Sequence, residues 1–87
     1  MSEQFDEIRR EIAANDASIV AAVNHRLELV TALWELKAEL GLDTIDPDRE
    51  RRLRETLAGT NSGPLSTKGL DRLVTDLLDL TKKELGV

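Results

Sequence analysis

Arg26 and Lys37 are the residues whose types and spacing first suggest chemistry. Apolar residues recur every seven positions between Glu3 and Leu40, and Arg26 takes a place in this series where another apolar side chain is expected. A guanidinium is costly to bury without an anion, and no acidic residue interrupts the same series to pair with it. Lys37 follows eleven residues later, which on a helix is about 16 Å along the axis and within roughly 20° of the same direction. Two long cationic side chains at this spacing could bracket a small polyanion.

Arg9 is a third cation near this face of the expected helix. It precedes Arg26 by 17 residues, or about 25 Å along a helix, so the two side chains cannot touch one small ligand within the same chain. A second copy of the chain, related by two-fold symmetry, could bring its own Arg9 to the ligand instead.

The segment "DPDRE", residues 46–50, concentrates charge between two apolar parts of the chain. Asp46 before a proline is typical of a helix N-cap, and Glu50 could simply pair with Arg54 one turn later. The basic run "RERRLR" does not indicate nucleic-acid binding, because acidic residues within and beside it offset most of its charge. From the residues alone, this segment marks the start of a second helix.

The elements that must position these residues are all helices. Residues 3–40 contain no proline and no glycine, and their apolar residues form two stripes, which predicts one long amphipathic helix. One stripe comprises Phe5, Ile12, Ile19, Leu33 and Leu40, and the other Ile8, Ala22, Leu29 and Leu36. Gly41 suits a left-handed C-terminal cap.

Two shorter helices are predicted after this break. The second runs from the Asp46 cap to near Gly59, and residues 59–65 form a loop. Ser66 caps the third helix. The apolar face of this helix contains Leu70, Leu73, Val74, Leu77 and Leu80. The fold class is therefore all-α, with one long and two shorter helices in a single domain, residues 1–87.

A second copy of the chain is the simplest partner that could bury the apolar stripes of the long helix. Two shorter helices from the same chain cannot bury both of its apolar stripes, and we expect an entwined helical homodimer. An ordinary coiled coil is the alternative, in which Asn15, a polar residue in the second stripe, would only fix the register.

Composition excludes several classes of function. The 87 residues contain no cysteine and one histidine, His25, which argues against a disulfide framework and a metal site. The net charge is −5, with one Phe and one Trp, so a nucleic-acid surface is not expected. The N-terminus is charged from the third residue, and no run approaches the roughly 20 apolar residues of a membrane span. We expect a soluble, cytoplasmic protein.

The motifs together resemble those of the all-helical chorismate mutases. The segment "IRREIAANDASIVAAVNHRLELVTALWELKAELGL", followed by "DPDRE" and by "GPLS" before the third helix, is similar to the ordered pattern of that family over nearly the whole chain. The resemblance implies entwined dimers of three-helix chains. It also implies an isomerase of aromatic amino acid biosynthesis, which rearranges chorismate to prephenate without a cofactor.

The resemblance also implies roles for individual residues. Arg26 and the partner subunit's Arg9 would clamp the two carboxylates of chorismate. Lys37 would donate to the ether oxygen, where negative charge grows as the C–O bond breaks. The resemblance further implies that Asp46 and Glu50 contact the ring hydroxyl. It implies that Arg49 contacts a carboxylate, directly or through water.

The third helix departs from the family pattern. Thr81 can replace the usual serine and bond a carboxylate, but four residues later, where the family has glutamine facing the ether oxygen, stands Leu85, which cannot donate. Glu84 could act when protonated, and Lys82 is another candidate, unless it is simply a solvated lysine near a helix C-terminus. Activity could then be low, acid-dependent, or completed by DAHP synthase, the first enzyme of the shikimate pathway, as in some short members of the family.

Alternative functions on the same fold stay open. Isochorismate pyruvate lyases and mutases of 4-amino-4-deoxychorismate resemble the family in fold and carboxylate clamp, and the complete "DPDRE" with Lys37 favours the hydroxyl-bearing substrate of the mutase. A non-catalytic helical dimerisation module is a third possibility, for which an apolar residue would be expected in place of Arg26.

Overall fold

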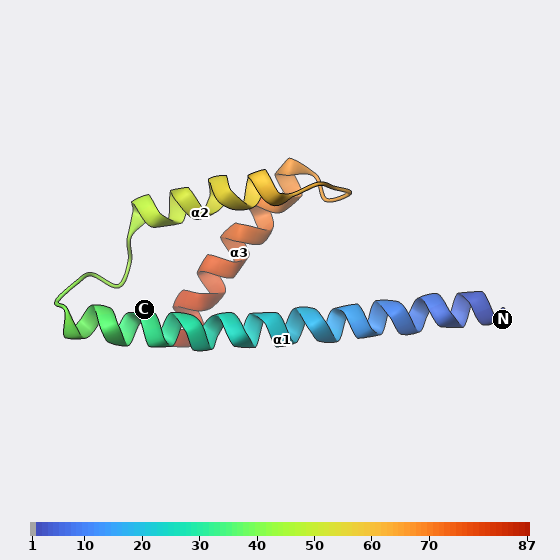
Figure 1. The fold of residues 1–87 in the computed structure, drawn as a ribbon, viewed down its shortest axis with the longest axis horizontal. Helices are drawn as coiled ribbons and strands as arrows, with labels where there is room; N and C mark the ends of the chain where they lie inside the picture. Colours follow the sequence, from blue (N-terminus) through green and yellow to red (C-terminus); the bar gives the residue numbers. More distant parts are fainter. Residues whose placement is uncertain (1) are drawn as a thin grey trace. The chain divides into compact units, whose positions relative to one another are not determined.

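The structure, a computed structural model, describes residues 2–87. These residues form three helices joined by loops. They are α1 (Glu3–Glu39), α2 (Pro47–Thr60) and α3 (Thr67–Leu85), coloured from blue to red in Figure 1. No strand occurs among residues 2–87. The predicted all-α class with three helices per chain is confirmed. The chain divides into two compact parts, residues 2–32 and 33–87.

The long helix ends where the sequence predicted, to within one residue. Gly41 has a φ of 70°, the left-handed conformation that glycine adopts without strain. Its N–H donates to the carbonyl oxygen of Ala38 at 3.2 Å, and the N–H of Leu42 donates to that of Lys37 at 2.8 Å. These two bonds form a Schellman cap. They fix the backbone at Lys37 and turn the chain back at this point.

The caps of the two shorter helices confirm their predicted starts. The Asp46 side chain accepts hydrogen bonds from the N–H groups of Asp48 and Arg49 at the start of α2. Ser66 Oγ accepts one from Gly69 N at 2.9 Å at the start of α3. Each cap satisfies backbone donors that the first helical turn leaves unpaired.

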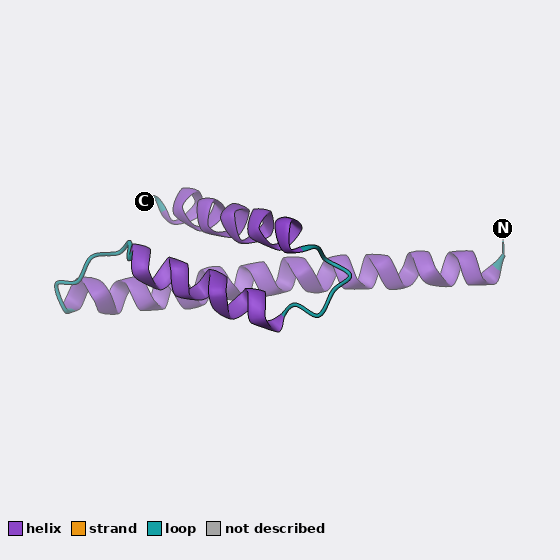
Figure 2. Cartoon of the chain, turned by 90° about the horizontal axis from the view of Figure 1, so that it is seen from above, coloured by secondary structure: helices purple, strands orange, loops and turns teal. Residues whose placement is uncertain are grey.

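Helices α2 and α3 pack against each other in antiparallel directions, as Figure 2 shows. The core of this pair is small: Val74 is 2% exposed and Thr81 is 5% exposed. Of the predicted apolar face of α3, Leu73 and Leu80 are exposed in the single chain. The packing of α2 on α3 therefore covers only part of that face.

Most members of the apolar stripes of α1 are exposed in the single chain. None of the residues that the structure describes in Glu3–Glu39 is buried. The exposed members of the two stripes include Phe5, Ile8, Ile12, Ile19, Leu29 and Leu36. Despite this apolar surface, no helix within residues 2–87 combines the length and hydropathy needed to cross a membrane. The predicted homodimer stays a prediction, and these residues are the surface that it requires.

Candidate active site

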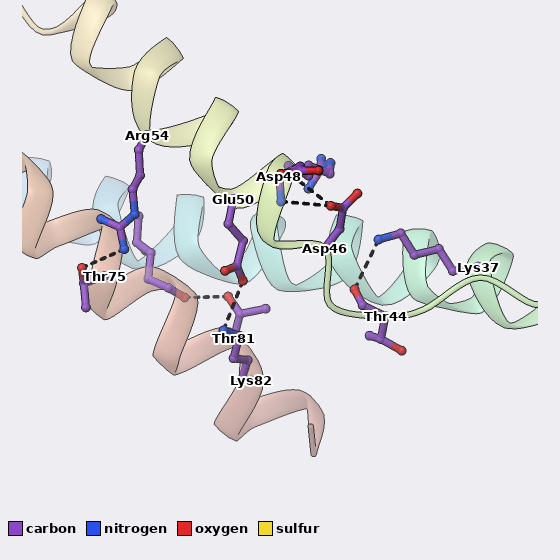
Figure 3. A network of polar contacts seen from close by, with 11 residues as sticks. Lys37, Thr44, Asp46, Asp48, Glu50, Arg54, Thr75, Thr81 and Lys82 are labelled. Carbon is purple, nitrogen blue, oxygen red and sulfur yellow. Dashed lines mark hydrogen bonds and ion pairs between the residues drawn. The ribbon is translucent and has the colours of Figure 1, made fainter.

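Lys37 is held in a defined position at the end of α1. It lies in the last turn, is half-buried, and its Nζ donates a hydrogen bond to the carbonyl oxygen of Thr44 at 3.2 Å (Figure 3). The Schellman cap brings residues 42–46 back along the helix end, which places this carbonyl within reach. The ammonium is thus held beside the start of α2 by a neutral acceptor.

A hollow of about 330 Å³ lies between the end of α1 and the start of α2. It is lined by Lys37, Leu42, Asp43, Ile45, Asp46 and Pro47. A cation and two carboxylate residues therefore share one small space with apolar side chains. Such a lining suits a small polar ligand that carries both charged and hydroxyl groups.

Asp46 combines two possible roles. Its Oδ1 accepts the hydrogen bonds from Asp48 N at 3.1 Å and Arg49 N at 3.2 Å, so the N-cap interpretation is confirmed. Both bonds end on the same carboxylate oxygen, and a carboxylate has a second oxygen that can accept from a ligand. The Arg49 side chain is exposed. Substrate contacts from Asp46 and Arg49 stay predictions.

Glu50 pairs with a residue that the sequence reasoning did not expect. Its Oε1 lies 3.1 Å from Lys82 Nζ, and the two side chains are only 28% and 32% exposed. Arg54, the local partner considered from the sequence, instead donates to Asp71 Oδ1 at 2.8 Å and to Thr75 Oγ1 at 2.9 Å. The interpretation of Lys82 as a solvated lysine is wrong, because the packing of α3 on α2 presents it to Glu50.

Lys82 was a candidate from the sequence, but nothing in the sequence indicated its pairing with Glu50. The signal in the sequence for a role in the site was its place directly after Thr81, near the end of the third helix. In an antiparallel pair, the last turn of one helix meets the first turn of the other, which carries Glu50. This contact depends on the packing of two helices and not on spacing within either of them.

Thr81 is buried at the same end of α3. Its Oγ1 donates to the carbonyl oxygen of Leu77 at 2.7 Å, and a hydroxyl has one proton to give. To donate to a substrate carboxylate, as the family resemblance implies, the hydroxyl would have to turn away from Leu77.

The last turn of α3 holds the two positions that depart from the family pattern. Leu85 is half-buried and Glu84 is exposed. Within the single chain, the Glu84 side chain is therefore not turned inward. Its catalytic role stays a prediction.

Arg9 and Arg26 belong to the part of the chain formed by residues 2–32. Arg9 is exposed, and its guanidinium carbon lies 4.8 Å from the centroid of the Phe5 ring, a cation–π contact. Arg26 is half-buried in α1. In the other part, residues 33–87, the structure brings Lys37 to the hollow beside Asp46 and joins Glu50 to Lys82. Among residues 2–87, no cluster of His, Asp or Glu side chains suits a metal ion.

Comparison with known protein families identifies the family to which this chain belongs. Residues 8–84 match the family model for chorismate mutase type II. The chain belongs to the chorismate mutase type II family. The match covers α2 entirely and nearly all of α1 and α3, so the resemblance drawn from the motifs is confirmed.

Two solved structures of a chorismate mutase from Thermus thermophilus are similar to this chain. The form I structure is 26% identical with a TM-score of 0.86, over 91% of this chain and 99% of that one. The form II structure is 26% identical with a TM-score of 0.87, over 93% of this chain and 92% of that one. A search of curated proteins gave no significant match. The similarity in fold thus extends over nearly the whole length of this chain and of each of the two solved structures.

Proposed function

We propose that this protein is an isomerase that rearranges chorismate to prephenate. Its membership of the chorismate mutase type II family supports this activity. The observation that carries the proposal is the placement of Lys37, whose ammonium is held by the Thr44 carbonyl and lines the same hollow as Asp46.

The reaction explains why fixed charges suffice. Chorismate carries two carboxylates, and its conversion is an intramolecular [3,3] rearrangement that needs neither a nucleophile nor a proton transfer. The protein must hold the compact diaxial conformer and stabilise the negative charge that grows on the ether oxygen. Both tasks are electrostatic, and preorganised donors accomplish them without a cofactor.

Lys37 would stabilise the transition state. When substrate binds, its ammonium would exchange the neutral Thr44 carbonyl for the ether oxygen. A hydrogen bond to an oxygen that becomes anionic is stronger than one to a neutral carbonyl. The contact therefore strengthens as the C–O bond breaks, which raises kcat and not only affinity.

The remaining site residues would hold the substrate. Asp46 and Glu50 would both contact the ring hydroxyl, which donates its one proton to one of these carboxylates at a time. Arg49 and Thr81 would contact a carboxylate. Arg26 and the partner subunit's Arg9 would clamp carboxylates bidentately, which selects the reactive conformer. The exposed members of the apolar stripes of α1 support the homodimer that this arrangement requires.

One assay tests the function. Purified protein would be incubated separately with chorismate, with isochorismate and with 4-amino-4-deoxychorismate, and each reaction followed by absorbance. We expect rapid loss of chorismate with formation of prephenate. Release of pyruvate from isochorismate, with no turnover of chorismate, would assign the chain to the lyases instead.

A partner protein could complete the site. Leu85 cannot donate to the ether oxygen, and Glu84 is exposed at the end of α3, so the C-terminal turn is where a docked DAHP synthase would act. Addition of that enzyme should then raise kcat/KM for chorismate. Equal rates with and without it, at concentrations where binding is verified, would remove the partner from the proposal.

A further inference from the structure

Glu50 and Arg54 of α2 both make polar contacts with α3, and of these two residues only Glu50 is proposed to contact the substrate. Glu50 pairs with Lys82, and Arg54 donates to Thr75 (Figure 3). Arg54 also donates to Asp71. Glu50 and Arg54 are one turn apart on α2, about 6 Å along its axis. The Arg54 contact holds the helices together and involves no residue that the proposed function assigns to the substrate. The Glu50–Lys82 contact places a lysine charge on a carboxylate that the proposed function assigns to the substrate.

Lys82 changes the charge that Glu50 presents to a ligand. The ammonium lies at Oε1 of Glu50, and the carboxylate still has Oε2 for a hydrogen bond to the ligand. Asp46 lies one turn before Glu50, and the proposed function assigns both carboxylates to the ring substituent. Without Lys82, two carboxylates would therefore act on the same ligand group. Two carboxylates attract a cationic group more strongly than a neutral hydroxyl.

The other positively charged groups near Glu50 cannot neutralise its carboxylate as Lys82 does. Arg54 is engaged by Asp71. The Arg49 side chain is exposed and therefore strongly hydrated. The N-terminus of α2 already donates two backbone N–H groups to Asp46. Lys82 is thus the cation placed directly on the Glu50 carboxylate.

We propose that Lys82 determines which substrate this site accepts, by neutralising Glu50 so that the pocket takes a ring hydroxyl and disfavours a ring ammonium. The inference rests on the proposed function, since it assigns Glu50 to the ring substituent. Chorismate carries a hydroxyl at this position, and 4-amino-4-deoxychorismate carries an amine that is protonated at neutral pH. Lys82 is a specificity-determining residue that acts through Glu50.

The experiment compares the two substrates in matched variants. The measured quantity is the ratio of kcat/KM for 4-amino-4-deoxychorismate to kcat/KM for chorismate, at one pH and low salt. Lys82→Met should raise this ratio about tenfold or more, because it removes a unit charge a few ångströms from the ligand ammonium. Lys82→Arg keeps the charge and should restore a ratio near that of the wild type.

Arg54→Met is the matched control. It breaks the contacts of Arg54 with α3 and should lower the melting temperature without changing the ratio. An unchanged ratio in folded Lys82→Met protein would overturn the inference. An equal change in Arg54→Met would also overturn it, since the effect would then come from helix packing. If Lys82→Met does not fold, as judged by circular dichroism, Lys82→Gln gives the same test.

Binding measurements separate this inference from the proposed function. If the wild-type protein turns over neither compound, the proposed function fails, and the ratio of the two Kd values from calorimetry replaces the ratio of kcat/KM. A shift of that ratio in Lys82→Met would still support the role of Lys82. Binding of neither compound by the wild-type protein would overturn both statements.

Discussion

Residues 2–32 and residues 33–87 differ in how much structure one chain provides for them. The first part is the N-terminal portion of α1, where the described residues include no buried side chain. The second part has a small core at Val74 and Thr81, polar contacts between α2 and α3, and the hollow beside Lys37. The contacts of the second part are made within the chain, whereas the first part exposes apolar side chains such as Ile8, Ile12 and Ile19.

The largest effect should follow from a change in the second part. Lys37→Ala removes the donor to the ether oxygen, and we expect kcat/KM for chorismate to fall about 100- to 1000-fold. Lys37→Arg should recover little, because a planar fork cannot take the place of a single ammonium beside one oxygen. Circular dichroism checks that both variants are folded. Near-normal turnover by Lys37→Ala would exclude this residue from the mechanism.

A large effect of another kind is expected in the first part. Ile19→Glu puts a charge into an exposed apolar stripe of α1, and sedimentation should show loss of the dimer at micromolar concentration, because a buried unpaired charge costs several kcal/mol. Ala17→Glu is the control, since it adds the same charge two residues earlier, outside both stripes. Dimers of equal stability in the two variants would mean that this stripe is not the interface.

The smallest effect separates the two roles of Asp46. Asp46→Ala should lower the free energy of unfolding by about 1 kcal/mol through loss of the N-cap, as Ser66→Ala should at α3. Asp46→Asn keeps the cap and removes the carboxylate, so its stability should stay close to that of the wild type while KM for chorismate rises. Chemical denaturation and steady-state kinetics measure the two quantities. An unchanged KM in Asp46→Asn would mean that Asp46 caps the helix and does not contact the substrate.

The helices were predictable because their ends depend on local chemistry. The Gly41 cap, the Asp46 and Ser66 N-caps and the apolar period each act within a few residues, so the bounds of α1 and α2 and the start of α3 followed from the sequence to within one residue. The position of Lys37 followed in the same way, since it lies inside the last turn before Gly41.

The pairing of Glu50 could not be read from the sequence in the same way. Arg54 stands at the favourable spacing on α2, yet Glu50 pairs with Lys82, which lies 32 residues later. The choice depends on which face of α3 packs against α2. The proposed roles of Arg9 and Arg26 depend on a second chain. They were predicted from the family resemblance and from the length of the helix, and not from any contact within the chain.

Mixed dimers test most directly whether the two parts of the chain meet in one site shared between subunits. Arg9→Ala lies in the first part and Lys37→Ala in the second, and each homodimer should be nearly inactive. In a heterodimer one pocket would carry both defects and the other neither, so random subunit exchange should restore roughly a quarter of wild-type activity. Native mass spectrometry verifies the exchange. No recovery above the two parent proteins, with exchange complete, would contradict a site built from Lys37 of one subunit and Arg9 of the other.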